Sequence, residues 1–218
     1  MPNTALRTYF DFIMSYAPYF YYLPDSGMVD PEWGRGPAPA AFAVEFLYEA
    51  YNAKEFETEK SAIYDKIVAL ADYLLSIQCN DNLKLACGGF KSRDDSTYYY
   101  SIDAMRAIPA LLKAYDLTGT VAYYDAAKLA GGTFLYNMQH KPSELGIHDK
   151  YYGGFAQAVT ITDLWVADMW VIDLYSLKAL KSLHTRTEEA KYQTMINDAL
   201  SFYRSGFENL YLKYSPPP

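Results

Sequence analysis

The sequence predicts an all-α fold of repeated helical hairpins, and two alignments of the chain with itself carry this prediction. Residues 64–78, followed by Cys87-Gly88-Gly89-Phe90, are echoed by residues 124–139, followed by Tyr152-Gly153-Gly154-Phe155, at a spacing of 60 to 65 residues. Residues 112–124 align without a gap to residues 180–192, which lie 68 positions further on. A repeat of this length holds two helices and their connections, so each unit is predicted to be one hairpin.

Apolar residues three and four positions apart predict the individual helices in chain order. They span approximately residues 4–22, 40–51, 59–77, 102–115, 121–138, 164–183 and 188–203. Pro18 is expected to kink the first helix or to end it early, and Gly119 is expected to end the fourth. The first helix of each pair carries little charge over its middle, whereas the second is amphipathic. The first is therefore predicted to be an inner, buried helix and the second an outer one.

We expect one domain over residues 1–218, because a single hydrophobic core can serve a chain of this length. Its predicted parts are an N-terminal helix and loop (1–38) and three approximate repeats (39–97, 98–162 and 163–212). Long connections run from each outer helix to the next inner one, and all of them return to the same end of the bundle. They cover residues 23–39, 80–97 and 140–162. Sites usually lie on loops held by a rigid scaffold, so this end is the predicted functional face.

Composition narrows the classes of function. No uncharged apolar run reaches the ~18 residues that a membrane-spanning helix needs. A net charge of −7 and a pI near 4.9 disfavour nucleic acid and anionic lipid as partners. Cys79 and Cys87 lack CxxC spacing, which favours two idle thiols over a disulfide and predicts no zinc site. The opening Met1-Pro2-Asn3-Thr4 lacks the features of a secretory signal, and the sequence leaves the localisation open.

An outer helix that ends in Gln, a loop with Gly-Gly-Phe and a following inner helix, all repeated, resemble the α/α-toroid (six-hairpin-like) superfamily. That group includes glycoside hydrolases, polysaccharide lyases, sugar epimerases, terpene cyclases and prenyltransferase β chains. The chain has no DxDD motif and no Asp, Cys and His set for zinc, so the resemblance is nearest to the carbohydrate-active branches. A closed toroid has about twelve helices, so the helices predicted here imply a partial or open toroid. Such an arc would expose the apolar faces of its end repeats, which favours self-association or a protein partner.

The first long connection offers residues for binding sugar. Glu32, Trp33 and Arg35 place an acid, an indole and a guanidinium within a few positions of one another. An aromatic plate with charged neighbours suits the stacking and hydrogen bonding of a sugar ring. The alternative is an ordinary surface loop whose Trp33 plugs the end of the bundle.

The second connection offers acids. Asp94 and Asp103 are the candidates for general acid and base, with Arg93 and Tyr98 as substrate-binding residues. Paired carboxylates in a cleft perform such proton transfer when their surroundings separate their pKa values, or they bind calcium. The alternative role for these acids is helix capping, with Asp103 near the positive end of a helix dipole.

The third connection adds His148 and Tyr152 as candidate catalytic residues, with Tyr151 and Trp165 as substrate-binding residues. A histidine beside a tyrosine suits the proton transfers of a lyase or an epimerase. The alternative is a solvated histidine without a role. The Gly-Gly pairs are interpreted as scaffold, because glycine permits backbone angles that other residues avoid.

Two hypotheses of function follow. The first is a protein that binds or acts on a polysaccharide or oligosaccharide in a groove formed by the three connections; as an enzyme it would be a polysaccharide lyase, a glycoside hydrolase or a sugar epimerase. The second is a non-catalytic structural or interaction protein, a subunit of a larger assembly with a tyrosine-rich interface. No cofactor is implied by the sequence, and calcium on carboxylates is the one metal to consider.

Overall fold

The computed structural model describes residues 4–15, 36–92, 96–141, 152–170 and 174–206. Its α-helices are α1 (Thr4–Ser15), α2 (Pro37–Asn52), α3 (Lys60–Ser76), α4 (Ser101–Thr118), α5 (Val121–Leu129), α6 (Tyr136–Met138), α7 (Tyr175–Thr187) and α8 (Ala190–Gly206). A 3-10 helix, η3 (Lys54–Glu59), precedes α3, and a π-helical stretch, η4 (Ala130–Leu135), joins α5 to α6. The strands are β1 (Tyr98–Tyr100), β2 (Ala156–Thr160) and β3 (Trp165–Trp170). None of the described helices is long and apolar enough to cross a membrane.

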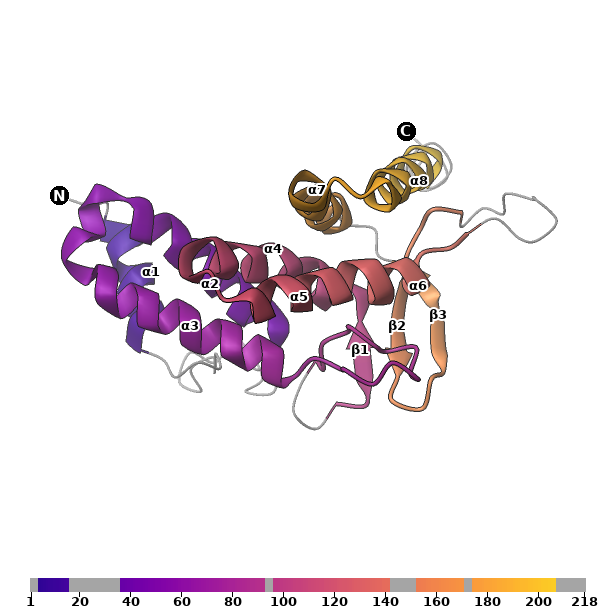
Figure 1. Cartoon of the computed structure of the whole chain (residues 1–218), viewed down its shortest axis with the longest axis horizontal. Helices are drawn as coiled ribbons and strands as arrows, with labels where there is room; N and C mark the ends of the chain where they lie inside the picture. The colour runs from indigo at the N-terminus through magenta and orange to yellow at the C-terminus, as the bar shows by residue number, and fades with distance from the viewer. Residues whose placement is uncertain (1–3, 16–35, 93–95, 142–151, 171–173, 207–218) are drawn as a thin grey trace, which may run out of the picture.

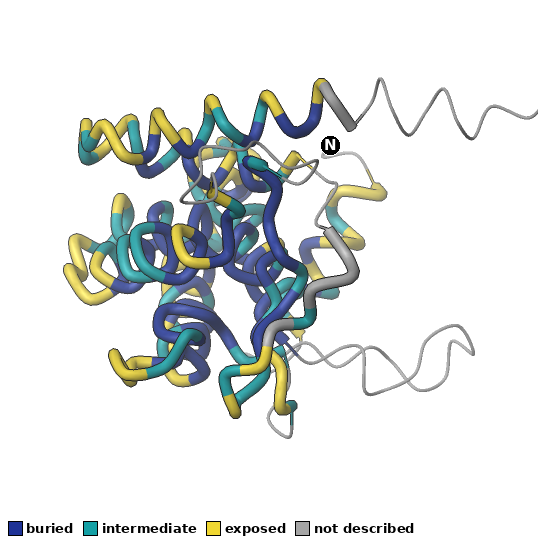
Figure 2. Tube along the Cα trace, turned by 90° about the vertical axis from the view of Figure 1, so that its right-hand side faces the viewer, coloured by how far each residue is buried: buried dark blue, intermediate teal, exposed yellow. Residues whose placement is uncertain are grey.

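Helical hairpins make up most of the described structure, as predicted. α2 packs on α3, α4 on α5 and α7 on α8, while α4 also packs on both α2 and α7 (Figure 1). The helices α2, α4 and α7 therefore form an inner layer, and the return helices lie outside it. In Figure 2 the buried segments gather in the interior of the molecule and the exposed ones lie around it. The predicted fold class of repeated helical hairpins is confirmed.

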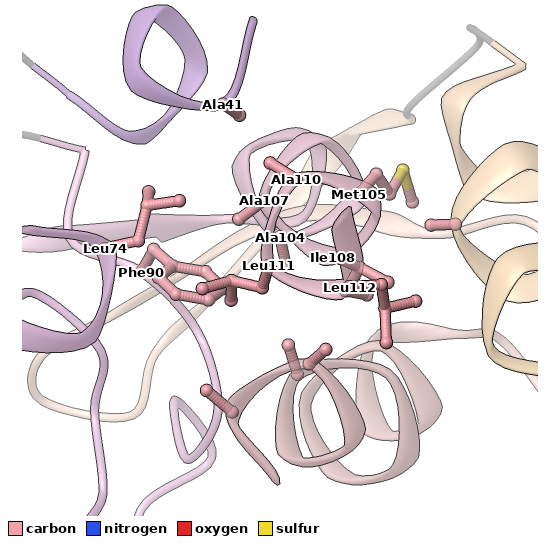
Figure 3. Packing of buried hydrophobic residues seen from close by; sticks show 14 of the residues in the cluster. Ala41, Leu74, Phe90, Ala104, Met105, Ala107, Ile108, Ala110, Leu111 and Leu112 are labelled. Atoms are coloured by element: carbon pink, nitrogen blue, oxygen red, sulfur yellow. The ribbon is translucent and has the colours of Figure 1, made fainter. Parts of the chain in front are cut away.

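The central helix is α4, which is apolar on nearly all sides. Its middle, from Ala107 to Leu112, is completely buried. Figure 3 shows Leu111 pointing toward Phe90 while Met105 lies on the opposite side of the helix. Gly119 ends α4 in the left-handed conformation (φ 70°), with its N–H donating to the carbonyl of Tyr115 at 2.8 Å. The predicted glycine stop is thus confirmed.

The prediction of one helix over residues 164–183 is wrong in its first part. Residues 165–170 form β3, which pairs antiparallel with β2, and α7 begins only at Tyr175. The sheet has the order β1-β2-β3, with β1 also antiparallel to β2. A short apolar run is compatible with either a strand or a buried helix, and here the turn between β2 and β3 favours the strand. Asp163 takes a left-handed φ of 60° in that turn, and Leu164 N–H donates to Thr160 Oγ1 at 3.0 Å.

The repeated Gln and Gly-Gly-Phe residues form a clamp between neighbouring hairpins. The side-chain amide of Gln78 donates to the carbonyls of Gly88 (3.1 Å) and Ala126 (2.9 Å). Gln139 repeats this arrangement with the carbonyls of Gly153 (3.0 Å) and Met195 (2.9 Å). Each glutamine thereby ties its own loop to the next outer helix, α5 or α8.

The glycines of the clamp are required by backbone contact. Gly88 and Gly153 have φ of 88° and 84°. A Cβ at Gly88 would lie 2.4 Å from the Leu129 carbonyl oxygen, and one at Gly153 would lie 2.0 Å from that of Asp198. Side chains are strained at these angles and the neighbouring backbone leaves no room for them. The interpretation of the Gly-Gly pairs as scaffold is confirmed.

Cys79 and Cys87 are free thiols, and both are buried beside this clamp. Burial raises the pKa of the Cys87 thiol. A protonated, buried thiol is unreactive, which agrees with the prediction of two idle cysteines.

Candidate active site

The first part of the inner helix α4 lies at the sheet end of the molecule. β1 runs directly into α4, because Tyr100 ends the strand and Ser101 starts the helix. The Ser101 hydroxyl donates to the Ala156 carbonyl at 2.6 Å, which ties the start of α4 to β2. In Figure 1 the sheet lies at the end where α4 begins and α6 ends. The site below is built at this end.

Asp103, in the first turn of α4, is a buried carboxyl with only 8% of its surface exposed. The described residues include five buried polar or charged ones: Gln78, Ser101, Asp103, Gln139 and Ser176. Both glutamines and both serines are hydrogen-bonded. Asp103 is the exception in the described part of the chain, with no hydrogen bond or ion pair.

Burial raises the pKa of Asp103 to about 7, although the nearby positive charge of Arg106 acts in the opposite direction. Desolvation disfavours the charged form of a carboxyl, and no hydrogen bond compensates for it here. Asp103 is thus divided between its acid and its base form near neutral pH. A carboxyl with a pKa near the operating pH suits the role of a general acid or base.

Arg106, one turn further along α4, joins the three inner helices. Its guanidinium carbon lies 5.3 Å from the centre of the Phe42 ring on α2 and 5.0 Å from that of the Tyr175 ring on α7. The two rings are 6.0 Å apart and tilted by 59°, so ring, ring and guanidinium form a triangle. Phe42 is 38% exposed, which is unusual for a phenylalanine on an inner helix. Phe42, Asp103, Arg106 and Tyr175 are called the inner-helix cluster below.

Ion pairs join the inner helices beyond this cluster. Lys178 on α7 binds Glu45 on α2 at 2.6 Å, Lys113 on α4 binds Glu49 on α2, and Arg186 on α7 binds Asp116 on α4. Ion pairs therefore connect α2, α4 and α7 beyond the cluster, and the sheet contacts the start of α4.

Four of the predicted site residues lie in the described structure: Tyr98, Asp103, Tyr152 and Trp165. Glu32, Trp33, Arg35, Arg93, Asp94, His148 and Tyr151 lie outside the described residues. Tyr98 is 39% exposed on β1, and its ring stacks on that of Tyr100 with centres 5.8 Å apart. Trp165 begins β3, and its backbone pairs with Val159 of β2.

Tyr152 occupies a different environment from Asp103. Its hydroxyl donates to Asp198 on the outer helix α8 at 2.7 Å, and this hydrogen bond raises the pKa of Tyr152. The residue immediately precedes the Gly153 clamp, so its hydrogen bond also ties the loop to α8. The predicted catalytic role of Tyr152 stays a prediction.

Phe42, Arg106 and Tyr175 were not predicted from the sequence. A signal for Arg106 was present, since it is the one basic residue in the run from Ile102 to Leu112 of a helix predicted to be buried. A cation at such a position needs partners from neighbouring helices. The sequence holds no comparable signal for the two aromatic residues, because Phe and Tyr are common in helical cores.

Comparison with solved structures shows what this fold is similar to. The chain is similar to the GH76 α-mannanase of Bacteroides thetaiotaomicron, with a TM-score of 0.62 and 14% sequence identity. The fold is that of an α/α toroid. The likeness covers 94% of this chain and 59% of the mannanase chain, so this chain spans under two thirds of that protein. No protein-family model and no curated protein sequence matches the chain.

The toroid fold confirms the resemblance seen in the repeated motif. The hairpins described here form a partial toroid, in which α2, α4 and α7 correspond to inner-layer helices and the clamp joins successive hairpins. At 14% identity the relationship shows the fold alone. Function depends on the residues of a site, which here are those of the inner-helix cluster.

Proposed function

We propose that this toroid is a carbohydrate-active protein that acts on a polysaccharide at the sheet end of its inner helices. The observation that carries the proposal is Asp103, a buried carboxyl with a pKa of about 7 beside partly exposed aromatic rings. The GH76 α-mannanase with the same fold supports a glycan as substrate. Glycoside cleavage combines a carboxyl that is protonated near neutral pH with a surface on which a sugar ring stacks.

In this proposal Asp103 is the general acid. Its proton passes to the glycosidic oxygen as the bond to the leaving sugar breaks, and a second carboxylate activates water or attacks the anomeric carbon. Asp94, on the connection that leads into β1, is our proposed second carboxylate. Phe42 and Tyr175 supply apolar ring faces for the sugar. The predicted residues on the neighbouring connections, Glu32, Trp33, Arg35 and Arg93, would extend the groove.

The test is a panel of polysaccharides that includes α-mannan and uronate polymers, with binding and release of reducing ends measured separately. We expect wild-type protein to bind and cleave at least one of them. Asp103→Asn keeps the size of the side chain but has no proton to give, so cleavage should fall by roughly 100-fold or more while binding persists. Asp125→Asn is the matched control, because Asp125 is exposed on the outer helix α5. Absence of both binding and cleavage across the panel would refute the proposal.

The alternative is a non-catalytic subunit of a larger assembly. It is favoured by the partial toroid, since this chain spans 59% of the length of the mannanase chain. End repeats of a helical array are stabilised when a neighbour covers them. Light scattering decides whether the chain self-associates, and a stable oligomer that binds no glycan would support this alternative.

A further inference from the structure

Arg106 carries a charge that the described protein does not pair. Its guanidinium makes no hydrogen bond or ion pair in the described part of the chain, and its buried Nε has no partner. Its contacts are the faces of the Phe42 and Tyr175 rings. Stacking on a ring uses the flat face of a guanidinium and leaves the N–H groups in its plane available.

The surrounding carboxylates do not offset this charge. Glu45 and Glu49 on α2 are paired with Lys178 and Lys113, as described above. The nearest acid on the same helix is Asp103, whose burial favours its neutral form. Within the described residues, Arg106 is thus a cation held by two aromatic rings, and its acidic neighbour on the helix, Asp103, is shifted toward its neutral form.

We propose that Arg106 recognises a carboxylate of the bound sugar, so that the glycan acted on at this site contains uronate units. The inference rests on the proposed function and names its substrate class. A carboxylate accepts two parallel N–H···O hydrogen bonds in the plane of a guanidinium, and this pairing is stronger than one with neutral hydroxyls. Phe42 is 38% exposed next to this guanidinium, so its ring is partly available to the sugar ring that carries the carboxylate.

The proposed role of Arg106 predicts that the chain prefers uronates to neutral sugars. A neutral glycan would cover Arg106 without supplying an anion, and a partly buried cation left unpaired is costly. A uronate supplies the anion and uses N–H groups that have no other acceptor. Arg106 is therefore a specificity-determining residue in this proposal, while proton transfer stays with Asp103.

The experiment is calorimetric titration of the full chain with oligosaccharides of galacturonate, glucuronate and mannuronate, each paired with its carboxyl-reduced form. We expect at least one uronate to bind about tenfold or more tighter than its reduced partner, as a charged hydrogen-bonded pair implies. Arg106→Gln should abolish that preference. Arg106→Lys keeps the charge and loses the planar fork, so the preference should shrink but persist. Arg204→Gln, at an exposed position near the end of α8, should leave it unchanged.

Each outcome bears on one proposal or on both. Equal binding of the uronates and their reduced forms, or a preference that survives in a folded Arg106→Gln variant, would overturn the role of Arg106. If neutral glycans are bound and cleaved in an Asp103-dependent way, the proposed function stands and only the uronate assignment fails. If no glycan of either kind is bound, both fail. Circular dichroism of each variant shows whether it is folded, and Arg106→Lys keeps the test decisive if Arg106→Gln is not.

Discussion

Replacing Asp103 by asparagine should change how stability depends on pH, and the size of the effect follows from its burial. The pKa of the carboxyl is 3.8 in an unfolded chain and about 7 in the folded protein. The folded protein therefore binds the proton of Asp103 more tightly than the unfolded chain does. The contribution of the Asp103 carboxyl to the free energy of unfolding is fully present below pH 3.8, falls as the pH rises toward 7, and is lost above that value. One pKa unit corresponds to about 1.36 kcal/mol, so the loss between these limits is roughly 4 kcal/mol.

The measurement is urea unfolding of wild type and Asp103→Asn at several pH values between 4 and 8. Asparagine does not titrate, so the difference in free energy of unfolding should move in favour of the variant by about 1.4 kcal/mol per pH unit up to pH 7. Above that it should stay constant. Asp125→Asn, which alters an exposed carboxyl, should show no comparable trend. Other acidic residues titrate in both proteins, so their contributions cancel in the difference between the two free energies of unfolding.

A difference that is flat with pH would refute the reasoning, because the folded and unfolded pKa values would then be equal. A difference that moves in favour of wild type with rising pH would show that the carboxylate is stabilised in the folded state. In that event Arg106 would act on Asp103 more strongly than burial does. Asp103 would then be ionised at neutral pH and unsuited to serve as a general acid.

Three further predictions test the scaffold and the predicted site. Gly153→Ala should lower the free energy of unfolding by about 2–5 kcal/mol, since it combines left-handed strain with a clash against the Asp198 carbonyl. Gly119→Ala, at φ 70° with open space around it, should lower the free energy of unfolding by only about 1–2 kcal/mol. Equal losses in the two variants would contradict the clash. Gln139→Leu should cost about 1–3 kcal/mol, measured by thermal unfolding, because the Gly153 carbonyl loses its side-chain donor while the Met195 carbonyl lies within α8; a neutral effect would show that the clamp is dispensable. Tyr152→Phe and Tyr123→Phe each remove a 2.7 Å hydrogen bond to an aspartate and should each lose about 1 kcal/mol; a loss of glycan cleavage in the first variant alone would assign Tyr152 to catalysis.

The helical hairpins could be predicted from the sequence because their information is local and repeated. Apolar periodicity locates the helices, and the alignment of Gln78 with Gln139 shows that two loops have the same construction. Gly119 is recognisable as a helix stop from its position alone. The strand β3 could not be predicted in this way, because its pairing with β2 depends on a turn whose geometry Asp163 and Thr160 decide.

The site was predicted only in part for a similar reason. Asp103 was selected as an acid near the start of an inner helix, and the structure shows that it is buried there. Its pKa, however, depends on which groups surround it, and a carboxyl at the same position with a capping partner would have stayed acidic. Phe42 and Tyr175 are 133 positions apart in the sequence. Their meeting around Arg106 is a result of the packing of α2, α4 and α7.

The polar groups without partners give the strongest reason to place function at the inner helices. Buried polar side chains elsewhere in the described structure form hydrogen bonds, as Gln78, Gln139 and Ser101 illustrate. Tyr192 on the outer helix α8 is an exception, with a buried hydroxyl that has no partner. That group is a neutral hydroxyl, whereas Asp103 and Arg106 are ionisable neighbours three positions apart on α4. A buried Arg106 Nε without a partner, next to a carboxyl whose pKa is raised by burial, destabilises the fold for no structural gain, so a ligand that binds here is the simplest reason for their presence.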